Sequence, residues 1–299
     1  MLGLGSSLTG GFLGGGPPFS LWLSGSDDYA RIDNNVSLKP TSAITVSTWV
    51  NLDAQYGGSG WTYVNPGGSN DHREYIVGTV ASGGYGLNVF YGGTEANPIV
   101  KISAQVYVAD TGNGNPGYLE TIWGGIVTST GSSALHEIKD LSGWVHLAMT
   151  YDGGVLRLYI NGDNDLNDGA VDTSDGQVVD TSLTGVAIVY TTATKVMIGG
   201  DAIGTGSSAN QLTISGLIDE VAIWSTALDQ QAITKIYNNG AATLNLTAAS
   251  GDYDNQASLE GYWRFEEGTG TTVADSSSNS NTVTLVNNPA WSDVALPLG

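Results

Sequence analysis

The sequence predicts an all-β protein, an antiparallel two-sheet sandwich with one short helix and a Gly-rich N-terminal arm. Two observations carry this prediction. Runs in which apolar and polar residues alternate recur along the 299 residues, as expected for strands with one face in a core. Turn-forming residues separate these runs, because the chain has 43 glycines but only 13% charged residues. Many short strands joined by tight turns account for this composition.

The chain divides into an arm at residues 1–19 and one sandwich at residues 20–299, since all-β units of this size often stay undivided. The arm is uncharged and carries isolated apolar residues, namely Leu2, Leu4, Leu8, Phe12, Leu13 and Phe19. Such a segment cannot alone bury enough surface to offset its conformational entropy. We expect a neighbouring subunit to hold it, and a disordered leader is the alternative.

Strand patterns follow the arm. They cover residues 21–32 around an acidic turn, then 44–52, 75–80, 85–91, 99–109, 184–192, 195–201 and 216–224. Residues 144–162 read WVHLAMTYDGGVLRLYING and predict a hairpin, because Asp152-Gly153 favours a type I′ turn between two alternating runs.

One helix is predicted from Asp229 to Asn239. Asp229 is the expected N-cap, and Gly240 would follow the last turn. The tail, residues 240–299, returns to strand patterns at 261–267 and 281–287. We expect this tail to complete the same sandwich, because some 40 residues are too few for a second one.

Charge and cysteine content exclude several classes of protein. The formal net charge is −20, and the 9 basic residues are scattered, which argues against nucleic-acid binding. The chain has no cysteine, so it forms no disulfide and no thiolate metal site. No apolar run approaches the roughly 18 residues that a membrane span needs.

Five segments suggest a family. In order, LWLSGSDDYARI, ITVSTWVNLD, GWVHLAMTYDGGVLRLYINGD, KVMIGGD and GLIDEVAIWSTALDQQAITKIYNNG resemble the laminin-G-like, concanavalin A-like jelly-roll domains over about residues 20–240. The resemblance implies two curved antiparallel sheets packed face to face, with Trp49, Trp144 and Trp224 in the core. The tail resembles a family segment that usually precedes the jelly roll. The opening MLGLGSSLTGG resembles structural proteins of tailed phages, particularly marine ones.

The sequence offers no good catalytic site. Glucanases of this superfamily need two carboxylates on one face, but Asp219-Glu220 and Glu266-Glu267 are adjacent pairs, and adjacent strand residues point to opposite faces. The G-x-G-x-x-G match at residues 112–117 opens no helix and reads as a turn. His146 alternates with apolar neighbours, so we interpret it as a satisfied sandwich histidine. We therefore expect no enzyme.

Calcium is the cofactor to consider, because its oxygen ligands commonly come from loops. Relatives often hold it near the rim of the sandwich, which makes Asp27, Asp28 and Asp219 candidate ligands, with the loop at 163–175 as a further place. Ser24 stands where the family pattern has an aspartate. The alternative at each position is ordinary turn chemistry.

Aromatic residues beside Gly-rich stretches are the candidates for binding a sugar, because ring faces stack on apolar sugar faces. These residues are Trp61, Tyr63, Tyr85 and Trp123. The alternative is that they cap the sandwich or pack against a neighbouring subunit.

We therefore expect a non-enzymatic virion structural protein, a capsid decoration or a tail or fibre component, that could bind glycans on the host surface. Its partners would be other virion proteins and further copies of itself. The first basic residue is Arg31, so the charged start of a secretory signal is missing, and we expect synthesis in the host cytoplasm and a place on the virion surface. A free carbohydrate-binding module or lectin, assisted by calcium, is the alternative.

Overall fold

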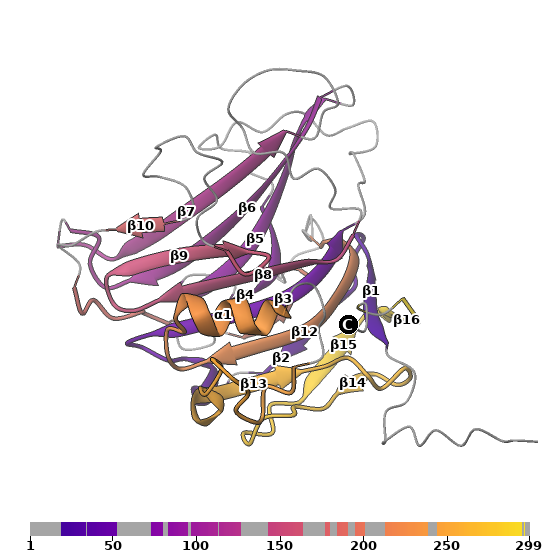
Figure 1. Ribbon diagram of the computed structural model, residues 1–299. Coiled ribbons are helices and arrows are strands. Elements are labelled where there is room, and N and C mark those ends of the chain that lie inside the picture. The colour runs from indigo at the N-terminus through magenta and orange to yellow at the C-terminus, as the bar shows by residue number, and fades with distance from the viewer. Residues whose placement is uncertain are drawn as a thin grey trace, which may run out of the picture.

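Two antiparallel sheets of eight strands each pack face to face in the computed structural model (Figure 1). The structure describes residues 19–33, 35–52, 73–79, 83–94, 97–112, 114–126, 143–163, 177–179, 184–190, 195–200, 213–238, 244–294 and 296. The predicted jelly-roll sandwich is confirmed. The arm residues before Phe19 lie outside these ranges.

The first sheet, sheet A, has a central strand with partners from both ends of the chain. Its order is β10 (Gln177–Val179), β9 (Val155–Ile160), β8 (Val145–Tyr151), β3 (Ile44–Leu52), β12 (Ser215–Trp224), β1 (Ser20–Ser24) and β16 (Ala290–Ser292), and β13 (Leu259–Trp263) also pairs with β12.

The second sheet, sheet B, contains the longest strands. Its order is β14 (Thr272–Val273), β15 (Val283–Val286), β2 (Tyr29–Ile32), β11 (Val196–Ile198), β4 (Arg73–Thr79), β5 (Gly84–Thr94), β6 (Asn97–Val108) and β7 (Gly117–Ile126). The strand predicted at residues 184–192 is wrong for the described part, where Ile188 and Tyr190 make only isolated bridges. The 3₁₀ turns η1 (Val36–Leu38) and η4 (Gln256–Ser258) lie in connections.

The main core lies between the sheets and is built by the alternation that the sequence displays. On β8, for example, Val145, Leu147, Met149 and Tyr151 all belong to this core. Burying such side chains is the dominant favourable term in folding. The other face of β8 is buried as well, because it faces a second core under the helix.

The hairpin between β8 and β9 turns one residue later than predicted. Tyr151 pairs with Leu156, so Gly153 and Gly154 form the loop. Only Gly153 of these two has a positive φ, at 91°, which matches a type II′ turn rather than type I′. The type I′ geometry occurs at the next turn, where Asn161 and Gly162 have φ values of 53° and 82°.

The helix α1 (Gln230–Tyr237) lies across the outer face of sheet A (Figure 1). The predicted N-cap is confirmed, because Ala232 N donates to Asp229 Oδ1 at 2.8 Å. The helix ends before Gly240, since Asn238 takes the left-handed conformation at φ 46°. In the part of the chain that the structure describes, no helix is long and apolar enough to cross a membrane.

Two of the three predicted core tryptophans are buried. Trp224 packs in the second core with Ile233 of α1, and Trp49 stacks on Tyr237 with ring centroids 5.7 Å apart. Trp144 is only half-buried, so its prediction is wrong.

The tail strands join both sheets. Strand β13 pairs with β12 in sheet A, and β15 pairs with β2 in sheet B. Strand β16 then pairs with β1. Yellow C-terminal strands therefore lie beside indigo N-terminal strands in Figure 1.

His146 is fully buried, as predicted, but only one of its ring nitrogens is satisfied, because Nδ1 has no hydrogen-bond partner among the described residues. Its Nε2 lies 2.8 Å from Ser47 Oγ, and its ring lies 5.2 Å from Trp49 and 6.1 Å from Tyr237. Burial lowers the pKa of His146 from 6.5 to about 3. Below pH 6.5 the imidazole takes up a proton in the unfolded chain but not in the folded chain. The free energy of unfolding therefore falls as the pH drops from 6.5 toward 3.

We predict that His146→Gln weakens this acid sensitivity. Between about pH 7 and pH 4.5 the wild-type protein should lose roughly 2–3 kcal/mol more unfolding free energy than the variant, because the variant has no imidazole to protonate. Urea unfolding at both pH values measures the difference. The comparison uses the change of unfolding free energy between the two pH values, which removes any cost of the substitution that does not depend on pH. An equal change in the two proteins would contradict the prediction.

Candidate functional site

The outer face of sheet B carries an exposed aromatic ring, that of Tyr118. Helix α1 covers the outer face of sheet A, whereas no helix among the described residues packs on sheet B. Side chains that alternate with the core positions on β4, β5, β6 and β7 form this outer face.

Tyr75 of β4 lies flat on two glycines. A Cβ atom at Gly78 would lie 3.2 Å from Tyr75 Cδ1 and 2.8 Å from Gly86 Cα, and one at Gly86 would lie 3.2 Å from Tyr75 Cε1. Side chains at these two positions would therefore lift the ring off the sheet. The Tyr75 ring is half-buried, so one of its sides rests on the backbone.

Uncharged polar groups continue the face from Tyr75. Gln105 Nε2 donates to the Tyr75 hydroxyl at 3.2 Å, and Asn88, opposite Tyr75 in register, donates from Nδ2 to Ser103 Oγ at 3.3 Å. Asn88, Ser103 and Gln105 are buried although they lie on the outer face. Amides and a hydroxyl thus hold one another in place.

A second aromatic group lies at one end of the same face. Tyr107 of β6 and Tyr118 of β7 are opposite in register, and their rings meet edge to face with centroids 4.7 Å apart. The Tyr118 side chain is 47% exposed, and its oxygen accepts from Gly83 N at 3.3 Å. Glu120 follows two residues later, on the same side of the sheet and opposite Gln105.

We call this surface the tyrosine face. It comprises Tyr75, Asn88, Ser103, Gln105, Tyr107, Tyr118 and Glu120. Sugars expose apolar ring faces as well as hydroxyl groups, so recognition of a sugar needs aromatic rings beside hydrogen-bonding groups. The tyrosine face offers an exposed ring at Tyr118, whereas Asn88, Ser103 and Gln105 are at most 2% exposed and support the face from beneath.

A buried carboxylate pair lies on the other sheet. A β-bulge interrupts β12 between Asp219 and Ala222, and Glu220 takes a positive φ of 49°. Asp219 is opposite Trp49 in register, and Glu220 lines a cavity with Trp49, so both carboxyl groups lie on the outer face of sheet A. The expectation that these adjacent residues point to opposite faces is therefore wrong, because the bulge breaks the alternation.

Neighbouring groups hold Glu220 in place. Tyr262 of β13 donates its hydroxyl to Glu220 Oε2, and Arg264 Nε lies 3.2 Å from Oε1. Burial raises the pKa of Glu220 from 4.5 to about 7, while Arg264 and Tyr262 oppose the rise. Burial and the charge of Glu220 raise the pKa of Asp219 as well. Because the folded state holds this Glu220 proton more tightly, its contribution to stability falls as the pH rises from 4.5 to 7.

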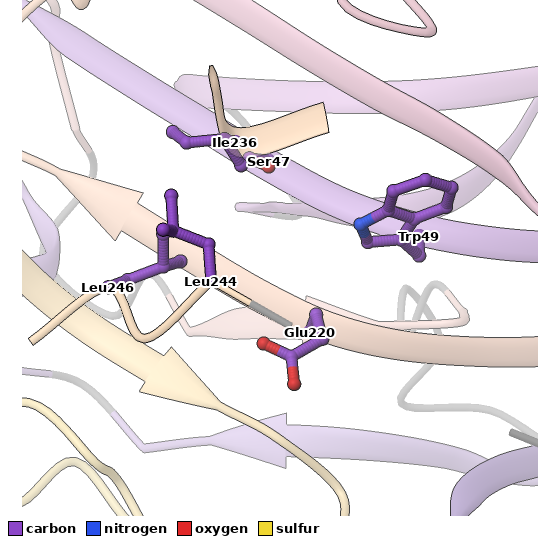
Figure 2. A pocket seen from close by; sticks show the side chains of 6 residues that line it. All are labelled: Ser47, Trp49, Glu220, Ile236, Leu244 and Leu246. Carbon is purple, nitrogen blue, oxygen red and sulfur yellow. The ribbon is translucent and has the colours of Figure 1, made fainter. Parts of the chain in front are cut away.

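The space beside Glu220 is too small for a sugar ring. The cavity measures about 10 Å³, roughly the room that one water molecule needs. Ser47, Trp49, Glu220, Ile236, Leu244 and Leu246 line it (Figure 2). Asp219 and Glu220 are only 3% and 8% exposed. The pair therefore lacks the open cleft that glycoside hydrolysis requires.

Two of the three predicted calcium ligands, Asp28 and Asp219, accept hydrogen bonds from the protein itself. Both carboxylate oxygens of Asp28 accept from Ser24 N, at 3.0 and 2.9 Å, and Asp219 Oδ1 accepts from Glu220 N at 2.8 Å. Asp27 is exposed, and its backbone oxygen accepts from Asn287 Nδ2.

Over the described ranges, no three or more His, Cys, Asp or Glu side chains are placed to hold a metal ion. Residues 164–175 of the further candidate loop lie outside those ranges. Calcium binding therefore stays a prediction.

The predicted sugar-binding aromatics are not brought together. Trp61 and Tyr63 lie outside the described residues, and Trp123 stands opposite Ile102 in register, with its side chain outside them. The prediction that Tyr85 binds a sugar is wrong. Tyr85 is 1% exposed, lies in the main core and donates its hydroxyl to Leu38 O at 3.1 Å. It cannot meet a ligand on the surface.

Sequence reasoning missed the tyrosines of the tyrosine face. Tyr75, Tyr107 and Tyr118 each occupy an outward position of an alternating run, so the strand period could have found them. The aromatic residues predicted from the sequence lie beside Gly-rich stretches instead.

Comparison with known proteins gives a family and a fold. The family model described as the concanavalin A-like lectin/glucanases superfamily matches residues 24–234. No curated protein sequence matches the chain.

Among solved structures, a candidate carbohydrate-binding protein from Bacteroides ovatus has a TM-score of 0.51 at 14% identity, over 94% of this chain and 61% of that one. This chain thus spans less than two thirds of that protein. A heptameric SAP-like pentraxin from Limulus polyphemus has a TM-score of 0.42 at 14% identity, over 74% and 82% of the two chains. The enzymatically active domain of a tailspike protein from bacteriophage CBA120 has a TM-score of 0.40 at 9% identity, over 88% and 35%. At these identities the likeness is one of fold.

We predict that Arg264→Gln destabilises the protein in a pH-dependent way. Loss of the cation leaves the buried Glu220 carboxylate without its partner, which should cost about 2 kcal/mol near pH 8, less than for a fully buried pair because Arg264 is half-exposed. The loss should shrink near pH 5.5, where Glu220 takes up a proton. Urea unfolding measures both values.

Arg157→Gln is the matched control. It removes an ion pair with Asp152 at 3.1 Å on the surface, so its cost should stay below about 1 kcal/mol. Equal losses for the two variants, or a loss at Arg264 that ignores pH, would contradict the role assigned to the Glu220 pair.

Proposed function

Because this chain belongs to the concanavalin A-like lectin/glucanases superfamily, we propose that it is a non-catalytic carbohydrate-binding protein that uses the tyrosine face. One observation carries the proposal. The half-exposed Tyr118 ring meets Tyr107 edge to face on the outer side of sheet B. An exposed aromatic ring in a fixed orientation is a group on which the apolar face of a sugar can stack.

Pre-organisation supports this proposal. The Tyr75 ring rests on Gly78 and Gly86, and Gly83 N fixes the Tyr118 hydroxyl. Side chains that are already ordered lose little entropy when a ligand binds, which favours affinity. The face is built on strands rather than on loops, and this rigidity suits a binding site.

The buried carboxylates support a non-catalytic function. A retaining glycosidase needs two carboxyl groups about 5–5.5 Å apart that flank a bound sugar. Asp219 and Glu220 meet Tyr262, Arg264 and a water-sized cavity instead. Incubation with oligosaccharides should therefore give no cleavage products, and measurable hydrolysis that Glu220→Gln removes would contradict this part of the proposal.

We further propose that the protein is displayed on a phage particle, as a capsid decoration or a tail or fibre component, through residues 1–18. Phe19 favours this placement, because its backbone N donates to Glu266 Oε2 at 3.3 Å and its ring fills the space left by Gly268. The preceding residues thus leave from a fixed point on the sandwich. Their partners would be other virion proteins and further copies of this chain.

We predict that Tyr118→Ala weakens glycan binding about tenfold, because exposed tyrosines at a recognition surface carry much of the binding energy. Trp22→Ala is the matched control, since Trp22 is 40% exposed but lies on sheet A. Titration calorimetry with a glycan selected from an array measures both. A loss of binding in Trp22→Ala but not in Tyr118→Ala would overturn the assignment to the tyrosine face.

We predict that deletion of residues 1–18 leaves the thermal unfolding of the sandwich unchanged and abolishes incorporation into particles. The apolar residues of the arm supply the contacts in this proposal. The control is a full-length chain in which Leu2, Leu4, Leu8, Phe12 and Leu13 are replaced by serine, and it should fail in the same way. Normal incorporation of the deletion variant, measured on purified particles, would remove the display proposal.

A further inference from the structure

We infer that residues 1–18 of one copy dock on an uncharged apolar patch on the outer face of sheet A of a neighbouring copy. We call this surface the tryptophan patch, and it comprises Trp22, Leu217, Ala290 and Val294. The inference rests on the proposed display through residues 1–18, and it names the surface that receives them.

The strand register brings the tryptophan patch together. The residues on either side of Trp22 belong to the main core, so the Trp22 side chain points to the outer face. Its register partners are Leu217 of β12 and Ala290 of β16. Val294 follows β16, and its backbone O accepts from Ser20 Oγ at 2.8 Å. Three neighbouring strands thus present apolar side chains on one side of the sheet.

The tryptophan patch leaves apolar surface in reach of solvent. Trp22 and Val294 are 40% and 51% exposed, and Ala290 is exposed as well. Two of the four large hydrophobic residues that are exposed in the described part of the chain therefore lie in this patch. The second core under α1 includes no residue of the patch. Contiguous exposed apolar surface commonly marks a site of interaction.

The patch and the arm match in their lack of charge. The outward positions of β1 and β16 hold only serine, alanine and tryptophan, in a chain with a formal net charge of −20. Residues 1–18 contain no Asp, Glu, Lys or Arg, and their apolar side chains include leucine and phenylalanine. Contact between two such surfaces buries apolar area without leaving a charge unpaired. The arm is therefore the occupant that this patch suits.

The arm joins the sandwich beside the patch. Phe19 N donates to Glu266 Oε2 at 3.3 Å, and Trp22 lies three residues farther along, about 10 Å at the rise of a strand. The arms of adjacent copies thus start next to the surface on which we expect them to dock.

The sequence before Phe19 favours a neighbouring copy over the same chain. Gly16 and Pro17 each precede a proline, which favours an extended backbone at both positions. An extended link directs residues 1–13 away from the Trp22 of their own chain. Because every copy carries both an arm and a patch, an exchange of arms between two copies fills both patches.

Sedimentation velocity of the full-length protein over a range of concentrations tests the contact. We expect association that Trp22→Ala weakens about tenfold or more, because tryptophan anchors carry much of the energy of an interface. Replacement of Leu2, Leu4, Leu8, Phe12 and Leu13 by serine should weaken it similarly. Combining the two changes should add little, since both remove the same contact.

Two further variants guard against an indirect effect. Trp22→Phe keeps an apolar ring and should retain most of the association. Val36→Ser is the matched control, because Val36 is 85% exposed but lies on η1, outside the patch. Thermal unfolding shows that each variant is folded. Glycan affinity per site should stay unchanged in Trp22→Ala, because Trp22 and the tyrosine face lie on different sheets.

Photo-crosslinking decides whose arm lies on the patch. Trp22 is replaced by benzoylphenylalanine in full-length chains, and unlabelled chains are mixed with nitrogen-15-labelled chains before irradiation. We expect mass spectrometry to find cross-links from position 22 to residues 1–13 that join a labelled chain to an unlabelled one. Cross-links confined to single chains, or none to the arm, would overturn the inference.

The outcomes separate the two proposals. A wild-type protein that stays monomeric, or association that Trp22→Ala leaves unchanged, overturns the inference. Normal incorporation of Trp22→Ala into particles, with incorporation lost on deletion of residues 1–18, also overturns it and leaves the display proposal standing. Normal incorporation of the deletion variant removes the display proposal, and association and cross-links then still decide the inference.

Discussion

Strand β12 exchanges partners along one edge, and this exchange ties both ends of the chain to one sandwich. Residues 215–218 pair with β1 from the N-terminal end, and residues 221–224 pair with β13 from the tail. The bulge at Asp219 and Glu220 lies at the change of partner. A bulge bends its strand and increases the local twist, so β12 can follow two strands that arrive from opposite ends of the sequence.

The bulge buries a carboxyl group, and β13 and the residues after it supply the partners of that group. It places the Glu220 side chain in a buried position on the outer face of sheet A, where an unpaired carboxylate would be costly. Tyr262 and Arg264, which supply the hydroxyl and the cation, come from the same segment that replaces β1 along β12. The tail segment that pairs with β12 therefore also supplies both partners of Glu220. A positive φ at a non-glycine residue persists because these neighbours over-determine it.

The alternation of apolar and polar residues predicts the sandwich and the strand faces. The residues around Asp229 predict the N-cap of the helix, because capping also depends on local spacing. The structure departs from the sequence where an element breaks that spacing. The bulge puts Asp219 and Glu220 on one face, and the β8–β9 loop centres on Gly153 and Gly154 instead of Asp152. The contact of the Tyr75 ring with the sheet could not be predicted from spacing either. Gly78 and Gly86 are strand glycines that make room for a ring, and a glycine alone does not reveal such a neighbour.

The two sheets offer different surfaces, and this difference decides how the protein can work. Helix α1 and the segment around Leu244 and Leu246 cover the outer face of sheet A over β8, β9, β12 and β13, while the tyrosine face leaves the Tyr118 ring on sheet B in reach of solvent. Phe19 enters beside β16, whereas Tyr118 lies on β7, at the far edge of the other sheet (Figure 1). The arm therefore joins the sandwich at one sheet, and the exposed Tyr118 ring lies on the other. Attachment through residues 1–18 and binding of a glycan at the tyrosine face can therefore occur at the same time on a single copy.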